Sequence, residues 1–270
     1  MAKRIAIHSV PRSGSTWLGT IFNSHPNVVY KYQPLFSYRL KGYLTPDSSK
    51  EEILEFFSKL KNTSDDFMDQ VEAKARNIVP EFEKDNEVEA IVYKEVRYHH
   101  VLRNLLEKDP EVKVIGLIRN PISTIYSWYN APREFRKDLG WDIMEEWKEA
   151  PSKNQGKPEE FNGFEKWKEV AILFEELELE FGSRFKKVFY GDLLSDTENM
   201  VKNIFEFSGL TFSSQTQAFL GKSRSKNVKD AYSVYRKKET DLNWDGNFDT
   251  SIIEAIKSDL KNSSLEQYLR

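Results

Sequence analysis

The chain has 270 residues, 39% of them hydrophobic and 13% aromatic, which is enough apolar material for a sizeable core. Its net charge of −3 at pH 7 argues against general nucleic-acid binding, so any anion site must be local. The absence of cysteine excludes disulfides, thiolate catalysis and cysteine-bound metals.

The sequence has no apolar run close to the ~18 residues of a membrane span, and no signal peptide precedes the first predicted strand. It also shows no repeat, low-complexity tract or linker. We therefore expect a cytoplasmic protein in which residues 1–270 form one domain.

The first twenty residues have the pattern of a phosphate-binding turn. Residues 3–10 read as a buried strand, and apolar residues at helical spacing begin at Trp17. The turn between them is Pro11-Arg12-Ser13-Gly14-Ser15-Thr16. A helix that starts after such a turn directs its backbone N–H groups and its dipole at an anion. Gly14 permits close backbone approach and Arg12 adds a forked cation. The alternative is a strand-to-helix turn without a ligand.

This turn is not a Walker A loop, because no Gly-Lys-Ser/Thr follows. Residues 11–18 instead resemble the 5′-phosphosulfate loop of sulfotransferases that use 3′-phosphoadenosine 5′-phosphosulfate (PAPS). Cytosolic members of that family carry Lys-Ser-Gly-Thr-Thr-Trp there, and Golgi-type and bacterial members carry Arg-Ser-Gly-Ser/Thr. The resemblance implies that the loop holds PAPS through Arg12, Ser13, Gly14, Ser15, Thr16 and Trp17.

A second landmark of the family departs from its pattern here. His25-Pro26 ends the first helix, and residues 28–30 favour a strand. The resemblance implies a Glu just beyond, commonly the general base that deprotonates the acceptor, but this chain has Gln33. Because Gln cannot accept a proton at neutral pH, the base lies elsewhere or the chemistry differs. Acceptor binding by Gln33 and no role for it remain equally open.

Two amphipathic helices are expected next, over residues 48–60 and 65–82, and then a strand at 90–93. The strand leads into Lys94, which resembles the family's strand-end Lys that faces the sulfonate. Cytosolic members carry a catalytic His two residues later, but Val96 stands there. The candidates for a replacement base are then the residues close to Lys94 in the sequence, namely Glu95, His99 and His100.

The third landmark is a strand at residues 113–118 followed by Arg119 and a helix from Pro121. It resembles the family's 3′-phosphate segment, in which a Ser lies eight residues after the Arg, as Ser127 does here. Eight residues are about two helical turns, so both side chains can converge on one phosphate. The alternative for Arg119 is a structural Arg paired with a buried carboxylate.

The remaining elements are predicted from local patterns. A polar loop at 150–158, within an aromatic and charged stretch, would suit a lid. A strand at 186–190 ends in Tyr190-Gly191-Asp192-Leu193, which resembles the family's Tyr-Glu-Asp-Leu, whose Tyr lies near the adenine. Helices are expected over 164–181, 199–207 and 251–269, and a basic loop over the cofactor at 219–227.

Together these motifs predict an α/β fold of three layers, with a mostly parallel central sheet between helices, as in P-loop-like sulfotransferases. We expect an enzyme that transfers a sulfonate from PAPS to a hydroxyl or amine without a metal. Its catalytic residues would be Arg12, Lys94 and Glu95, and the Arg-type loop favours a glycan or glycolipid acceptor. A non-catalytic PAPS-binding protein that lost its base is a second hypothesis, and a nucleotide-dependent kinase is a third.

Overall fold

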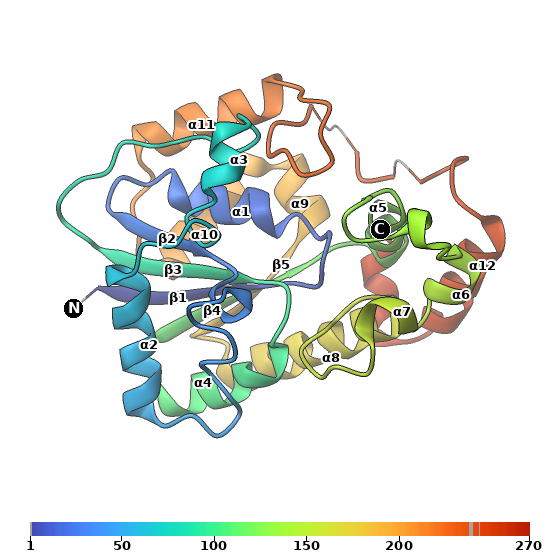
Figure 1. The fold of residues 1–270 in the computed structure, drawn as a ribbon, viewed down its shortest axis with the longest axis horizontal. Helices are drawn as coiled ribbons and strands as arrows, with labels where there is room; N and C mark the ends of the chain where they lie inside the picture. Colours follow the sequence, from blue (N-terminus) through green and yellow to red (C-terminus); the bar gives the residue numbers. More distant parts are fainter. Residues whose placement is uncertain (1, 238–239, 243) are drawn as a thin grey trace.

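The computed structural model describes residues 2–237, 240–242 and 244–270. Its centre is a five-stranded parallel sheet with the order β2-β3-β1-β4-β5 (Figure 1). The strands are β1 (Lys3–His8), β2 (Val28–Tyr32), β3 (Ala90–Glu95), β4 (Val112–Ile118) and β5 (Phe185–Phe189). Every predicted strand is present, and the predicted parallel α/β fold is confirmed.

Helices cover both faces of the sheet, because each face of a parallel sheet must be buried. One face packs against α1 (Ser15–Asn23), α9 (Tyr190–Ser195), α10 (Thr197–Ser208) and α11 (Ser214–Ser225). The other packs against α2 (Lys50–Asn62), α4 (Leu102–Lys108) and α8 (Phe164–Phe181). Two more helices, α5 (Pro121–Tyr129) and α12 (Thr250–Leu260), extend the core of this face past the end of the sheet.

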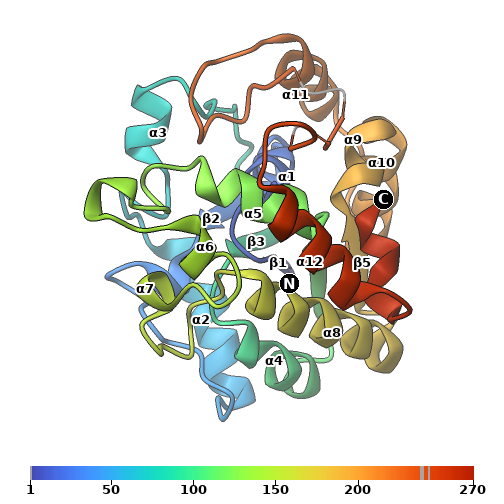
Figure 2. The ribbon, with the colours of Figure 1, turned by 90° about the vertical axis from the view of Figure 1, so that its right-hand side faces the viewer.

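The helices α5 and α12 lie with the short helices α6 (Ile143–Glu146) and α7 (Pro151–Asn154) at the edge where the strands end (Figure 2). Ligands bind at this edge in open parallel sheets, because the connecting loops meet there. Within the described ranges, no helix combines the length and apolarity that crossing a membrane requires.

Three local predictions were wrong. Residues 65–82 contain only one short helix, α3 (Val71–Ala75). The segment before α3 is a turn instead, because the Asp65 carboxylate accepts hydrogen bonds from the backbone N–H groups of Phe67 and Met68. The predicted basic loop at 219–227 is mostly the end of α11, whose N-cap Ser213 accepts from the Thr216 backbone. The last predicted helix divides into α12 and a 3₁₀ helix at Ser264–Leu269.

Gly116, in the middle of β4, offers a test of how tightly the helix α8 packs on the sheet. A Cβ built at this position would lie 2.6 Å from the Phe174 ring and 2.7 Å from the Phe185 ring. Gly116→Ala is therefore expected to lower the free energy of unfolding by about 1–3 kcal/mol, as overpacked cores do.

Gly221→Ala in α11 is the matched control, because a Cβ there has no neighbour within 4 Å. The same chemical change should raise the free energy of unfolding by about 0.5–1 kcal/mol, since alanine is the better helix former. Denaturant unfolding measures both variants. Equal effects of the two substitutions would contradict the packing at Gly116.

Candidate functional site

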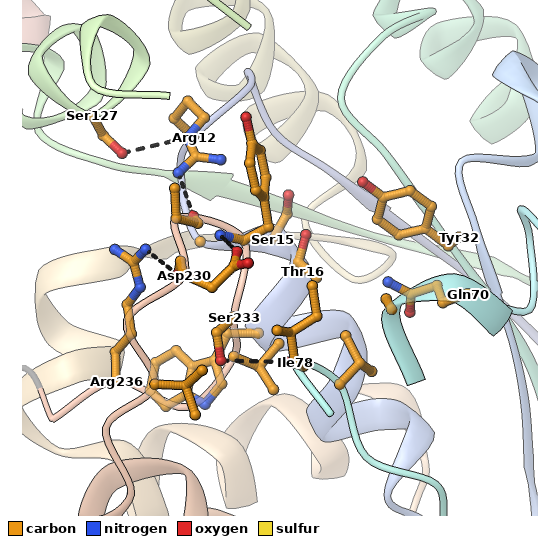
Figure 3. A pocket seen from close by; sticks show the side chains of 18 of the residues that line it. Arg12, Ser15, Thr16, Tyr32, Gln70, Ile78, Ser127, Asp230, Ser233 and Arg236 are labelled. Atoms are coloured by element: carbon orange, nitrogen blue, oxygen red, sulfur yellow. Dashed lines mark hydrogen bonds between the residues drawn. The ribbon is translucent and has the colours of Figure 1, made fainter. Parts of the chain in front are cut away.

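A cleft of about 1090 Å³ opens at the carboxyl edge of the sheet (Figure 3). Ten of the twelve residues predicted to form the site line it. They are Arg12, Gly14, Ser15, Thr16, Trp17, Gln33, Lys94, Arg119, Ser127 and Tyr190. The structure thus gathers residues from five separate parts of the sequence around one space.

The floor of the cleft is the loop after β1 and the start of α1. Gly14 caps the helix with φ 90°, a conformation that glycine adopts without strain. A Cβ there would lie 2.4 Å from the Tyr190 ring, so only glycine fits. The first N–H groups of a helix have no intrahelical partner, and those of Ser15 and Thr16 belong to this turn. The N-terminus of α1 therefore offers donors to an anion.

Ser13 lies beneath this loop and does not line the cleft. Its hydroxyl oxygen is buried, and within the described part of the chain it has no hydrogen-bond partner. A buried polar group without a partner is costly, but a hydroxyl outside the lining of the cleft does not contact a ligand there, so the cofactor-binding role of Ser13 stays a prediction.

Arg12 is held over the loop by neighbours from two other segments. Its Nε donates to Ser127 Oγ at 3.4 Å, and its Nη2 donates to the Ala231 carbonyl at 2.8 Å. Burial lowers the pKa of the Arg12 guanidinium, and the nearby charge of Arg119 lowers it further. The cleft therefore contains a concentration of positive charge that an anion would relieve.

Arg119 joins the two predicted anion sites. Its Nη1 donates to the backbone carbonyl of Arg12 at 2.7 Å, and its guanidinium lies 5.2 Å from the centre of the Tyr190 ring. Arg119 also pairs with the Asp241 carboxylate through Nε at 2.9 Å and Nη2 at 2.6 Å. The structure shows the pairing with a buried carboxylate, and because Arg119 also lines the cleft, its role toward a 3′-phosphate stays a prediction.

Lys94 and Glu95 occupy opposite faces of β3, as adjacent residues of a strand must. Lys94 lines the cleft, with its Nζ 4.3 Å from the centre of the Tyr32 ring. Burial lowers the pKa of Lys94 to about 7. Glu95 lies outside the cleft, where the Leu35 N–H donates to its carboxylate at 2.7 Å and burial raises its pKa. That carboxylate cannot exchange a proton directly with a ligand in the cleft.

The two histidines named as replacement-base candidates are also outside the cleft. His99 is fully buried and its Nδ1 lies 3.0 Å from Nδ1 of His8, on the face of the sheet away from the loop. Burial lowers the pKa of His99 well below its ordinary value. His100 is exposed in the 3₁₀ helix at His99–Val101, just before α4. None of residues 150–158, the predicted lid, lines the cleft.

Gln33 lines the cleft with its side chain fixed. Its backbone has φ 43°, and its Oε1 accepts a hydrogen bond from Arg97 Nη1 at 2.9 Å. Arg97 in turn pairs with Glu160 at 2.9 Å. The side-chain amide N–H groups of Gln33 are hydrogen-bond donors, which suits recognition of a polar acceptor.

Sequence reasoning missed several residues of the cleft, among them Arg236 and Glu134. Burial lowers the pKa of Arg236, and the charge of Arg119 contributes, so the two cations are close neighbours. The adjacent basic pair Arg236-Lys237 was the available signal for it. Glu134 follows α5 without any local motif. Within the described ranges, no cluster of His, Asp or Glu could hold a metal ion.

Comparisons with known proteins agree with this geometry. A family profile described as "Sulfotransferase domain" matches residues 2–268. A mouse sulfotransferase complexed with PAP has 15% identity and a TM-score of 0.55, with 99% of this chain and 87% of that chain covered. No curated protein matches the chain by sequence.

Two further solved structures share the fold. Retinol dehydratase in complex with retinol and PAP has 16% identity and a TM-score of 0.54, with 98% of this chain and 83% of that chain covered. A sulfotransferase from Alicyclobacillus acidocaldarius has 13% identity and a TM-score of 0.52, with coverages of 82% and 90%. Because the profile spans nearly the whole chain and the fold agrees, the chain belongs to the sulfotransferase family.

Proposed function

We propose that the protein transfers the sulfonate of PAPS to a hydroxyl or amine of an acceptor, and that this cleft is the active site. The observation that carries the proposal is the hydrogen bond from Arg119 to the Arg12 carbonyl. It joins the N-terminus of α1 to a second buried cation, so one cleft has donors for both ends of a doubly phosphorylated adenosine.

In this proposal the N-terminus of α1 holds the 5′-phosphate end through the N–H groups of Gly14, Ser15 and Thr16. Arg119 and Ser127 hold the 3′-phosphate, and Arg236 adds a cation that lines the same cleft. Arg119 has donors to spare, because Nη1 and Nη2 each carry a second N–H beyond those bonded to Arg12 and Asp241.

The adenine would lie near two aromatic rings. Trp17 and Tyr190 are in edge-to-face contact, with ring centres 6.2 Å apart, and both line the cleft. Ser223 fixes the indole by accepting from Trp17 Nε1 at 3.2 Å. Such fixed rings offer a flat surface for a base without a further cost in side-chain entropy.

Arg12 and Lys94 would neutralise the charge that develops on the sulfonate oxygens and on the leaving phosphate. Fixed cations act strongly in a site that excludes water, and they need not reorganise during the reaction. PAPS supplies the transferable sulfonate, and the chain supplies position and charge. This division of labour requires a proton acceptor for the incoming hydroxyl, which Gln33 cannot provide.

We further propose a glycan or glycolipid as the acceptor, with Gln33 as one of its ligands. Tyr32 and Phe67 line the cleft in contact, with ring centres 5.4 Å apart. A second hollow of about 480 Å³ begins at Phe67 and includes Phe36 and Tyr38. Aromatic faces beside polar groups suit sugar rings.

The single domain over residues 1–270 and the cytoplasmic location stay predictions from the sequence.

A non-catalytic protein that binds the same nucleotide is the second candidate, and Gln33 at the family's base position favours it. The two functions separate in one pair of measurements. We expect thermal stabilisation by 3′-phosphoadenosine 5′-phosphate (PAP) to exceed that by AMP or ATP. We then expect transfer of ³⁵S from labelled PAPS to extracted glycans. Stabilisation without any transfer would favour the non-catalytic protein.

Arg119→Ala should weaken PAP binding by roughly 100-fold or more while AMP binding changes little, because only PAP has a 3′-phosphate for this charge-assisted pair. Calorimetric titration with both nucleotides measures the difference. The double variant Arg119→Ala/Asp241→Ala is the control, since it leaves no buried carboxylate without its partner. Equal losses for the two nucleotides would contradict the role of Arg119.

PAP binding should take up a proton at pH 8. Lys94 has a pKa of about 7, lowered chiefly by burial, so it is mostly neutral at pH 8. A bound anion favours the charged form and raises that pKa, so affinity is greatest below pH 7 and falls as the pH rises above it. Titration calorimetry in two buffers of different ionisation enthalpy measures the uptake, and Lys94→Met should abolish it. An uptake that persists in this variant would assign the proton to another group.

A further inference from the structure

The proposed reaction needs a proton acceptor in the cleft, and the predicted candidates do not supply one. Gln33 is an amide, and Glu95 and His99 lie outside the cleft. Four carboxylates of the described residues line it, namely Asp66, Glu72, Glu134 and Asp230. The question is which of them faces the place where the sulfonate would lie.

Two of these carboxylates are committed to cations at the rim. Asp230 accepts from Arg76 Nη2 at 2.6 Å and from the Tyr232 N–H at 2.7 Å. Glu72 pairs with Arg76 at 3.4 Å and with Arg133 at 3.6 Å, and its side chain is 76% exposed. Each oxygen of Asp230 already accepts a hydrogen bond and Glu72 is largely exposed, so neither carboxylate is well placed to take a proton from an acceptor.

Glu134 lines the cleft together with Arg12 and Lys94, the two cations that we propose to neutralise the sulfonate. Burial lowers the pKa of the Arg12 guanidinium, and the negative charge of Glu134 is the strongest influence that raises it. The same charge acts on Lys94 and Arg97, which come from a different part of the fold. Of these three cations Arg12 and Lys94 line the cleft, as Glu134 itself does, whereas Arg97 lies behind it and bonds to Gln33. Asp66 lies where the cleft meets the second hollow, since it lines both.

The backbone fixes Glu134 in this position. Its N–H donates to the Ala131 carbonyl at 2.8 Å, in a turn that directly follows α5. The next residue, Phe135, is buried between Trp128 and Trp141, with ring centres 5.0 Å and 5.8 Å away. This aromatic cluster accounts for the unusual aromatic content of the segment after Ser127. It anchors the turn and leaves the Glu134 side chain, which is 26% exposed, toward the cleft.

We propose that Glu134 is the general base of this enzyme. The resemblance gives that role to a Glu at the position where this chain has Gln33. One carboxylate oxygen, Oε2, lies 3.6 Å from Lys153 Nζ, which orients the group and leaves Oε1 for the acceptor. Other ionisable groups that its charge reaches are those of Tyr32 and Tyr232. The inference rests on the proposed function.

The chemical step balances without any further reagent. Glu134 takes the proton from the acceptor O–H, and the acceptor oxygen forms a bond to sulfur. The bond from sulfur to the bridging oxygen of the 5′-phosphate breaks, and its electron pair stays on that oxygen. The products are the sulfated acceptor, PAP and protonated Glu134, which returns its proton to solvent.

The test compares Glu134→Gln, Glu134→Asp and Glu72→Gln with the wild-type chain. The assay follows ³⁵S from labelled PAPS to maltose, glucosamine or 2-naphthol, or to water when no acceptor is added. Glu134→Gln should lower kcat by about 10²–10⁴-fold on the best acceptor, the range for loss of a general base. Glu134→Asp should keep an intermediate rate. Glu72→Gln should stay within about twofold of wild type.

The affinity of each variant for PAP, measured by titration calorimetry, separates this inference from the proposed function. Glu134→Gln should bind PAP as tightly as wild type or more tightly, because a negative charge beside Arg12 and Lys94 is removed. More than a tenth of the wild-type kcat in Glu134→Gln, or a loss of PAP affinity as large as its loss of rate, would overturn the assignment.

Two further outcomes are informative. A wild-type chain that binds PAP but consumes PAPS no faster than the uncatalysed rate would overturn the base together with the catalytic part of the proposed function. A wild-type chain that does not bind PAP would overturn the proposed function itself, and the base with it.

Discussion

The site depends on the hydrogen bond between the Arg119 side chain and the Arg12 carbonyl. The sheet makes that bond possible, because β1 and β4 are parallel neighbours and His8 is in register with Gly116. Both strands therefore end at the same edge, and the residues that follow them meet. An antiparallel pair would have sent the loop and the cation to opposite ends of the sheet.

The cleft concentrates buried positive charge, which is costly in the absence of a ligand. Burial opposes the charged forms of Arg12, Lys94 and Arg119, and the chain offsets this with carbonyls and with the carboxylate of Asp241. These partners satisfy the cations only in part, so an anion with several charges has a prepared place. Ligand affinity and folding stability are thus opposed at this site, as is common where charge is preorganised.

Strand geometry explains which of the predicted site residues reach the cleft. Lys94 and Glu95 are adjacent in sequence, yet the period of a strand puts them on opposite faces. Lys94 shares its face with α1, whereas Glu95 lies on the face of His99. Proximity in sequence was therefore a poor guide to a catalytic pair. Glu134 reaches the cleft from beyond α5, through a turn that an aromatic cluster anchors.

The sequence alone determined the elements whose signals are local. The buried strands, the turn at Gly14 and the spacing of Arg119 and Ser127 depend on neighbours within about two helical turns, so pattern and motif suffice. Tertiary structure decided the pairing of Arg119 with Asp241 and the approach of Arg236. These partners lie far apart along the chain, and only the folded sheet and its covering helices bring them together. A sequence period or motif cannot reveal a contact between two residues that only folding brings together.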